Sequence, residues 1–212
     1  MSRRPVPGRL PPGAVQHLRA ADPLLSDLID RVGSFQPMIQ PDLWRSLIAS
    51  IVGQQLSGAA AEAILGRLEH AAPGGEFPGP AELLVLPDDT LRAAGLSRAK
   101  VRSLHDLAEK WTDGTLEPER IGEMDDEQVI AHLTEVKGIG RWTAEMVLIF
   151  TLERPDVFPA DDLAIRTAVQ RLHGYDERPE HTRMLLVAEP WRPFRTVASH
   201  YLWRSLRLET DG

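Results

Sequence analysis

Apolar residues recur at helical spacing along most of the chain. The clearest stretch repeats at i, i+4 and i+8, which places these side chains on one helical face: Leu43, Trp44, Leu47, Ile48, Ile51 and Val52. Polar residues suited to cap helices precede several such segments: Asp42, Ser57, Ser97, and either Asp125 or Asp126. Proline and glycine turns separate the segments, and no stretch shows the period of two that is typical of a half-buried β-strand. The pattern predicts an all-α fold of about ten short helices.

Composition changes this picture mainly by exclusion. The 212 residues contain no cysteine, which excludes a disulfide scaffold, a zinc ribbon, an iron–sulfur cluster and a thiol nucleophile. No apolar stretch approaches the roughly 20 residues that span a bilayer. Residues 1–13 are rich in proline and basic residues and lack the apolar run of a secretory signal, so we expect a mobile arm and a cytoplasmic protein. The net charge of −7 argues, on its face, against a nucleic-acid partner.

Two glycines flank one aliphatic residue between two helical patterns, at Gly138-Ile139-Gly140. Glycine allows torsions that are closed to other residues and leaves backbone amides uncovered, while Ile139 can anchor the turn in the core. The helix that follows presents free amides and the positive end of its dipole, which can bind a phosphate without side-chain charge. The alternative interpretation is an ordinary helix–turn–helix connection with a glycine cap.

An acidic doublet, Asp161-Asp162, precedes a further helical segment. Aspartate is a routine N-cap, and a negative charge is favoured at a helix start, so capping alone explains the doublet. The same position also holds a carboxylate rigidly and in its ionised form, as electrostatic catalysis requires. The two interpretations are compatible, and the spacing alone favours the cap.

Four segments together resemble one family: Lys137–Ala144, Val157–Arg166, Leu47–Ser57 and Trp191–Trp203. They resemble the hairpin, the loop with its essential Asp, an upstream element and the C-terminal helix of the helix-hairpin-helix DNA glycosylase superfamily, in its alkylation-repair branch (3-methyladenine DNA glycosylase II). The resemblance runs from about Leu24 to Arg204. It implies a two-lobed helical bundle within residues 14–212, with a helix-hairpin-helix motif and an active-site cleft between the lobes. One lobe would comprise about residues 41–152, and the other about 14–40 with 153–212.

The resemblance also implies roles for single residues. Asp162 matches the catalytic Asp, and a base flipped out of the duplex would enter an aromatic pocket. Trp142 and Trp203 match pocket aromatics, with Trp44 and Phe158 as weaker candidates, although packing in the core is the commoner role of a helical aromatic residue. Met146 departs from the family, whose best-studied members carry a tyrosine there, and this affects the range of lesions.

The DNA contacts implied by the resemblance fall into two groups. Gln55 and Leu56 match the wedge that fills the vacated base stack, although Leu56 could instead be buried and Gln54 could hydrogen-bond the turn. The predicted phosphate-binding residues are Lys137, Gly138, Ile139 and Gly140 of the hairpin, with Arg98 and Lys100 from a basic cluster that is otherwise a solvated helix face.

No histidine spacing typical of a metal site occurs, so we expect no catalytic metal or cofactor. Hairpins of the family can hold a Na⁺ or K⁺ ion through backbone carbonyls, here those of Thr134, Val136 and Ile139.

Trp142 stands where superfamily members that also cut the strand carry a lysine nucleophile. The resemblance therefore implies a monofunctional glycosylase that removes N3- and N7-alkylated purines from damaged double-stranded DNA without lyase activity. We also expect the protein to be a monomer and to associate with the nucleoid. The alternatives are a non-catalytic hairpin module that binds DNA structure, and a glycosylase for oxidised or deaminated bases. Because hairpin amides replace lysines, we expect DNA binding to depend only weakly on salt.

Overall fold

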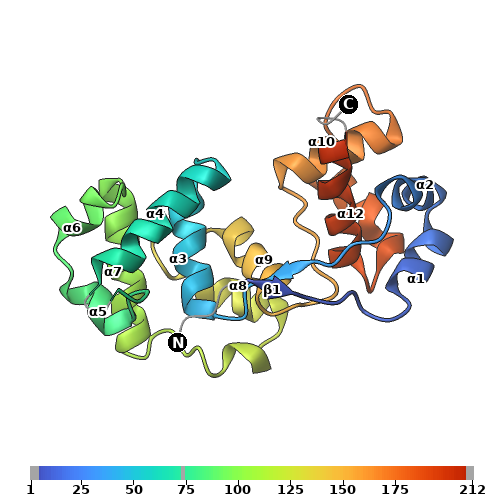
Figure 1. Cartoon of the computed structure of the whole chain (residues 1–212). Helices are drawn as coiled ribbons and strands as arrows, with labels where there is room; N and C mark the ends of the chain where they lie inside the picture. The colour runs from blue at the N-terminus through green and yellow to red at the C-terminus, as the bar shows by residue number, and fades with distance from the viewer. Residues whose placement is uncertain (1–4, 73–74, 209–212) are drawn as a thin grey trace. The chain divides into compact units, whose positions relative to one another are not determined.

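The computed structural model describes residues 5–72 and 75–208, which form two compact units. Unit 1 comprises Met1–Pro5 and Gln40–Leu152, and unit 2 comprises Val6–Ile39 and Glu153–Gly212. Most of the described residues are helical, and strands account for only Val6–Pro7 and Met38–Ile39 among them, which confirms the predicted all-α class (Figure 1). None of the helices in this part of the chain is long and apolar enough to span a bilayer.

Unit 1 is built from short helices. Its elements are α3 (Leu43–Gly53), α4 (Gly58–Ala71), α5 (Pro80–Val85), α6 (Asp88–Ala93), α7 (Arg98–Thr112), the 3₁₀ helix η1 (Ile121–Glu123), α8 (Asp126–Thr134) and α9 (Arg141–Phe150). Side-chain caps mark the starts of α3, α4, α7 and α8. The predicted caps are confirmed: the side chains of Asp42, Ser57, Ser97 and Asp125 each accept a hydrogen bond from the amide three residues on. Helix α7 packs against α5, α3 and α6.

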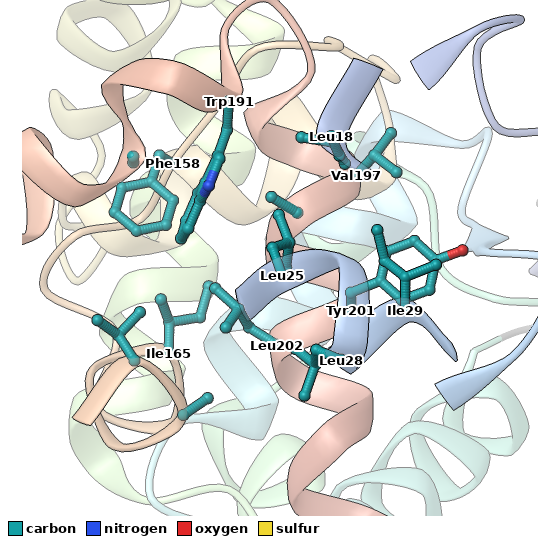
Figure 2. Close-up of a cluster of buried hydrophobic side chains, with 14 of the residues drawn as sticks. Leu18, Leu25, Leu28, Ile29, Phe158, Ile165, Trp191, Val197, Tyr201 and Leu202 are labelled. Atoms are coloured by element: carbon teal, nitrogen blue, oxygen red, sulfur yellow. The ribbon is translucent and has the colours of Figure 1, made fainter. Parts of the chain in front are cut away.

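Unit 2 joins segments from the two ends of the chain. It contains β1 (Val6–Pro7), α1 (Ala14–Ala21), α2 (Pro23–Val32), β2 (Met38–Ile39), α10 (Leu163–His173), α11 (His181–Ala188), the 3₁₀ helix η2 (Glu189–Trp191) and α12 (Arg195–Leu208). Helix α12 packs against α10 and α2 and carries the fully buried Tyr201 and Leu202. Figure 2 shows these side chains in one apolar cluster with Leu25 and Ile29 of α2.

The prediction of a mobile arm over residues 1–13 is wrong where the structure describes it. Val6 pairs with Ile39 and Pro7 with Met38 in a short antiparallel ladder, and the Gly8 amide donates to the Pro37 carbonyl at 2.7 Å. A two-residue strand is too short to show a period of two, so no local pattern indicated it. Residues 1–4 lie outside the described part of the chain.

Candidate active site

Asp162 stands at the N-terminus of α10 and is buried in unit 2. Its Oδ1 accepts the backbone amide of Ile165 at 2.8 Å, which makes it the N-cap of the helix. The same oxygen accepts the indole N–H of Trp203 in α12 at 3.1 Å. One carboxylate oxygen is thus fixed by donors from two helices, so capping and a positioned carboxylate occur together, as the sequence allowed.

The loop before Asp162 is held by the start of α12. The Arg195 guanidinium bonds both carboxylate oxygens of Asp156 and its backbone carbonyl, at 2.7–3.0 Å. The Thr196 hydroxyl accepts the amide of Val157 at 2.9 Å and donates to the carbonyl of Arg154 at 2.6 Å. These contacts join residues about 40 positions apart, so the sequence did not reveal that Asp156 helps to place the catalytic candidate.

A buried histidine, His200, lies beside the bonded pair of Asp162 and Trp203. The His200 and Trp203 rings meet edge-on with centroids 5.9 Å apart, and His200 is 8% exposed. Burial lowers the pKa of His200 to about 4, with a smaller contribution from the Arg204 guanidinium. His200 is therefore neutral near pH 7 and adds no positive charge beside the indole that meets Asp162.

The hairpin between α8 and α9 depends on one of its two glycines. Gly138 has φ +85°, and a Cβ atom there would collide with the Ser103 hydroxyl of α7, so torsion and space both require glycine. Ile139 is 4% exposed and its amide donates to the Val136 carbonyl, which confirms that this side chain anchors the turn. Gly140, the N-cap of α9, has φ −99°, and a Cβ atom at this position would meet nothing within 4 Å. The prediction of a special torsion is therefore wrong for Gly140.

A buried carboxylate of α7, which sequence reasoning missed, fixes the start of the hairpin. Asp106 accepts the Lys137 amide at 2.8 Å and contacts the ammonium groups of Lys137 and Lys110 at 3.0 and 2.9 Å. Burial raises the pKa of Asp106, but the bonds from Lys137 and Lys110 outweigh it and lower that pKa to about 2. Because 31 residues separate Asp106 from Lys137, no local pattern could have indicated this contact.

The basic residues predicted to bind phosphate have different surroundings in the structure. Arg98 begins α7 and is exposed, whereas the Lys100 ammonium donates to the carbonyls of Val52 and Gln54, each at 2.7 Å. Lys100 thereby directs two donors of its ammonium group toward the protein, and its phosphate-binding role stays a prediction. The Lys137 side chain stays 75% exposed despite its ion pair, but its amide is taken by Asp106.

A cavity of about 900 Å³ in unit 1 gathers four predicted residues. Trp142 and Met146 of α9 line it together with Gln55 and Leu56 after α3. Trp142 is 44% exposed, which is unusual for so large an apolar ring and gives the cavity an aromatic wall.

Polar residues that the sequence analysis did not single out line the same cavity. The buried Arg45 side chain lies 4.5 Å from the Phe77 ring centroid and 3.9 Å from the Glu69 carboxylate. The cavity can therefore offer both hydrogen-bond donors and acceptors to a polar ring.

Trp44 and Phe158 belong to the hydrophobic cores and not to this cavity, which corrects their assignment as pocket residues. Trp44 packs edge-on against Trp111 at 5.0 Å and donates its indole N–H to the Pro78 carbonyl. Phe158 packs edge-on against Trp191 at 5.6 Å in unit 2, as Figure 2 shows. Each is less than 9% exposed, so core packing is the physical reason for these aromatic residues.

Side chains suited to divalent metals do not cluster in the described part of the chain, where histidine, aspartate and glutamate form no group of three or more that could hold an ion. The three carbonyls predicted to hold Na⁺ or K⁺ lie at and after the end of α8, and that of Val136 already accepts the Ile139 amide at 3.0 Å. Carbonyl oxygens with a second lone pair are suitable donors for such a cation.

Comparison with known proteins agrees with this geometry. Residues 48–193 match the model of the HhH-GPD superfamily of base excision DNA repair proteins. DNA-3-methyladenine glycosylase 1 of Schizosaccharomyces pombe is 38% identical over 91% of this chain and 86% of its own length. The structure of this yeast enzyme (Mag1) in complex with abasic DNA has a TM-score of 0.83 and covers 90% of this chain and 95% of that chain.

A bacterial structure gives the same result. DNA-3-methyladenine glycosidase from Bacillus halodurans is 34% identical, has a TM-score of 0.83 and covers 99% of this chain and 95% of that chain. Since the family model matches more than half of the sequence, the protein belongs to the HhH-GPD superfamily of base excision DNA repair proteins.

Proposed function

We propose that this DNA glycosylase removes alkylated purines of the 3-methyladenine and 7-methylguanine type from duplex DNA by hydrolysing the N-glycosidic bond. The observation that carries the proposal is the carboxylate of Asp162, fixed by the Ile165 amide and the Trp203 indole. Relatives of this protein that are named as 3-methyladenine glycosylases or glycosidases support the substrate class.

In the proposed reaction, the bond between C1′ and the purine nitrogen breaks, and its electron pair leaves with the base. Positive charge develops on the deoxyribose, and the Asp162 carboxylate stabilises it electrostatically. Water adds to C1′, with Asp162 orienting it or accepting its proton. An alkylated purine is already cationic and becomes neutral as it leaves, so a single carboxylate suffices, unlike the carboxylate pair of ordinary glycosidases.

The flipped base would be recognised by aromatic contact. A cationic purine is attracted to the face of an indole, and the exposed Trp142 beside Met146 supplies such a face. Within unit 2, Trp203 bonds Asp162, and its role as a pocket aromatic stays a prediction from the family resemblance. Methionine is flexible and polarisable, so Met146 supports a broader range of alkylated purines than a rigid aromatic residue would.

The hairpin would hold a DNA phosphate through backbone groups. Gly140 precedes α9, whose first-turn amides lie at the positive end of the helix dipole. The open space in front of the Gly140 Cα supports a close approach of a phosphate oxygen. We propose that the carbonyls of Thr134, Val136 and Ile139 can hold a monovalent cation, which would supply positive charge next to that phosphate.

We further propose that the enzyme is monofunctional. Trp142 occupies the position of the lysine nucleophile, and an indole cannot form a Schiff base with the sugar. Borohydride treatment during turnover should therefore trap no covalent DNA adduct, and a trapped adduct would contradict this part of the proposal. We also propose that the protein is a monomer; light scattering of the protein with and without DNA tests it.

The decisive test is release of 3-methyladenine and 7-methylguanine from methylated duplex DNA by the wild type and by Asp162→Asn. Asparagine keeps the cap oxygen but removes the charge, so release should fall at least about a hundredfold with the helix intact. Asp161→Asn, in the exposed neighbour, is the matched control. Equal release by wild type and Asp162→Asn would reject the carboxylate role. DNA binding without release by the wild type would favour a binding module, and release of only oxidised or deaminated bases would identify a different substrate class.

A further inference from the structure

The wedge candidate follows the end of α3, where Lys100 makes its two bonds. Carbonyl groups in the last turn of a helix lack partners within the helix and carry the negative end of its dipole. The Lys100 ammonium donates to the carbonyls of Val52 and Gln54 at 2.7 Å each, and so fixes the backbone on both sides of Gly53. The lysine thereby sets the direction in which the chain leaves α3.

The segment that leaves α3 is a strained, exposed turn. Gln55 has φ +59°, in the left-handed region that a residue other than glycine keeps only when its surroundings impose it. The Leu56 amide donates to the Gly53 carbonyl at 3.1 Å and closes the turn. Leu56 is 41% exposed, so an apolar side chain projects from a rigid tip, as insertion into a base stack requires.

The same turn is tied to the hairpin 84 residues further along the chain. The Gln54 side chain donates through Nε2 to the Gly138 carbonyl at 2.7 Å. The hairpin is held in turn by α7, through the contact of Gly138 with Ser103 and the bond from the Lys137 amide to Asp106. Helix α7 also carries Lys100. The wedge turn, the hairpin and α7 therefore form one hydrogen-bonded assembly.

We propose that Lys100 and Gln54 are positioning residues that hold the wedge turn Gln55-Leu56 at a fixed place relative to the hairpin. When the hairpin takes a phosphate, the assembly delivers Leu56 to a defined base step, so phosphate binding and wedge insertion occur together. The inference rests on the proposed function, because it assigns a task within base flipping. In this proposal Lys100 bonds backbone carbonyls of the protein and does not bind a DNA phosphate.

Three variants test the inference, each with a methionine of similar length in place of a polar side chain. Lys100→Met removes the bonds to the end of α3, and Gln54→Met removes only the bond to the hairpin. Arg102→Met removes the same charge as Lys100→Met from an exposed position on the same helix. The probe is a duplex with an abasic-site analogue next to 2-aminopurine, whose fluorescence rises when neighbouring bases unstack.

We expect the fluorescence rise at saturating protein to fall at least about threefold in Lys100→Met and Gln54→Met and to stay near wild type in Arg102→Met. Single-turnover release of 7-methylguanine should slow about tenfold or more when the lesion is paired with cytosine. Release from a mismatched pair should slow clearly less, because unstacking a mismatched base costs less free energy. A purely structural defect would slow both substrates equally.

Other outcomes overturn the inference. If Lys100→Met keeps the fluorescence rise but binds undamaged duplex more weakly and with a smaller salt dependence, Lys100 is a phosphate ligand. If Gln54→Met keeps the rise, the link to the hairpin is not needed. Should Lys100→Met fail to fold, Gln54→Met decides alone. A wild type that unstacks the abasic duplex but releases no alkylated purine would contradict the proposed function, and the fluorescence comparison would still decide the inference.

Discussion

Trp203 donates its indole N–H to the same oxygen of Asp162 that caps α10. A hydrogen bond to a charged acceptor is stronger than one between neutral groups, and here it restricts the rotation of the carboxylate. The C-terminal helix therefore has a direct part in aiming the catalytic candidate, in addition to packing unit 2.

Replacing Trp203 with phenylalanine keeps an aromatic ring and removes the donor. We expect the single-turnover rate of base release to fall roughly tenfold, as for loss of one hydrogen bond to a charged group. The affinity for an abasic duplex should stay within about twofold of wild type, because binding does not require the aimed carboxylate. A loss of affinity equal to the loss of rate would show that the indole acts in binding and not in positioning.

The two hairpin glycines should respond differently to alanine. Gly138→Ala places a Cβ against Ser103 at a positive φ, so the free energy of unfolding should fall by about 1–3 kcal/mol. Gly140→Ala meets neither obstacle and should leave the melting temperature unchanged, yet it should weaken DNA binding because the methyl group obstructs the phosphate. Thermal unfolding and fluorescence anisotropy with duplex DNA measure both effects. Unchanged DNA affinity in Gly140→Ala would reject the phosphate site.

Two tryptophans of unit 1 offer a second matched pair. Trp44→Ala should destabilise the protein by about 3–5 kcal/mol, since it removes a buried ring and leaves a cavity. Trp142→Ala removes an exposed ring and should reduce excision strongly with little change in stability. Chemical denaturation and single-turnover assays distinguish the two, and a stability loss in Trp142→Ala comparable to that in Trp44→Ala would show that Trp142 is a core residue.

Asp106 should make stability depend on acidity. Its folded pKa of about 2 lies below the ordinary value of 3.8, so its contribution is complete above about pH 4 and is lost as the pH falls through about 2. Asp106→Asn should therefore be less stable than wild type at pH 6, and the difference should shrink as the pH falls from 4 to 2. Denaturation curves at several pH values measure this, and a constant difference would contradict it.

The salt dependence of DNA binding should be shallow. Lys100 is occupied by carbonyl groups and Lys137 is paired with Asp106, so few lysines remain to neutralise phosphates in this part of unit 1. The logarithm of affinity should fall with the logarithm of salt concentration with a slope of magnitude roughly 3 or less. A slope approaching that of a repressor with many basic contacts, about 10, would mean that side chains dominate the grip.

The local features of the chain were predictable from sequence because they arise between residues that are close together. Helix periodicity indicated the all-α class, and the caps at Asp42, Ser57, Ser97 and Asp125 each involve an amide three positions away. The glycine pair indicated the hairpin for the same reason. The two-residue strand Val6–Pro7 was not predicted, because its pairing partner lies some thirty residues away and two residues are too few to show a period.

Only the tertiary structure decided which structural role each of several residues of similar type and local sequence takes. Trp44 and Trp142 share a residue type and a helical setting, and only packing makes one a core residue and leaves the other exposed. Lys100 and Arg98 stand in one basic cluster, yet Lys100 is the one that reaches carbonyls at the end of another helix. The partners of such contacts lie tens of residues apart, as in the bonds from Gln54 to Gly138 and from Lys137 to Asp106. Periodicity records which side of a helix faces inward, but it does not record which distant atom that side meets.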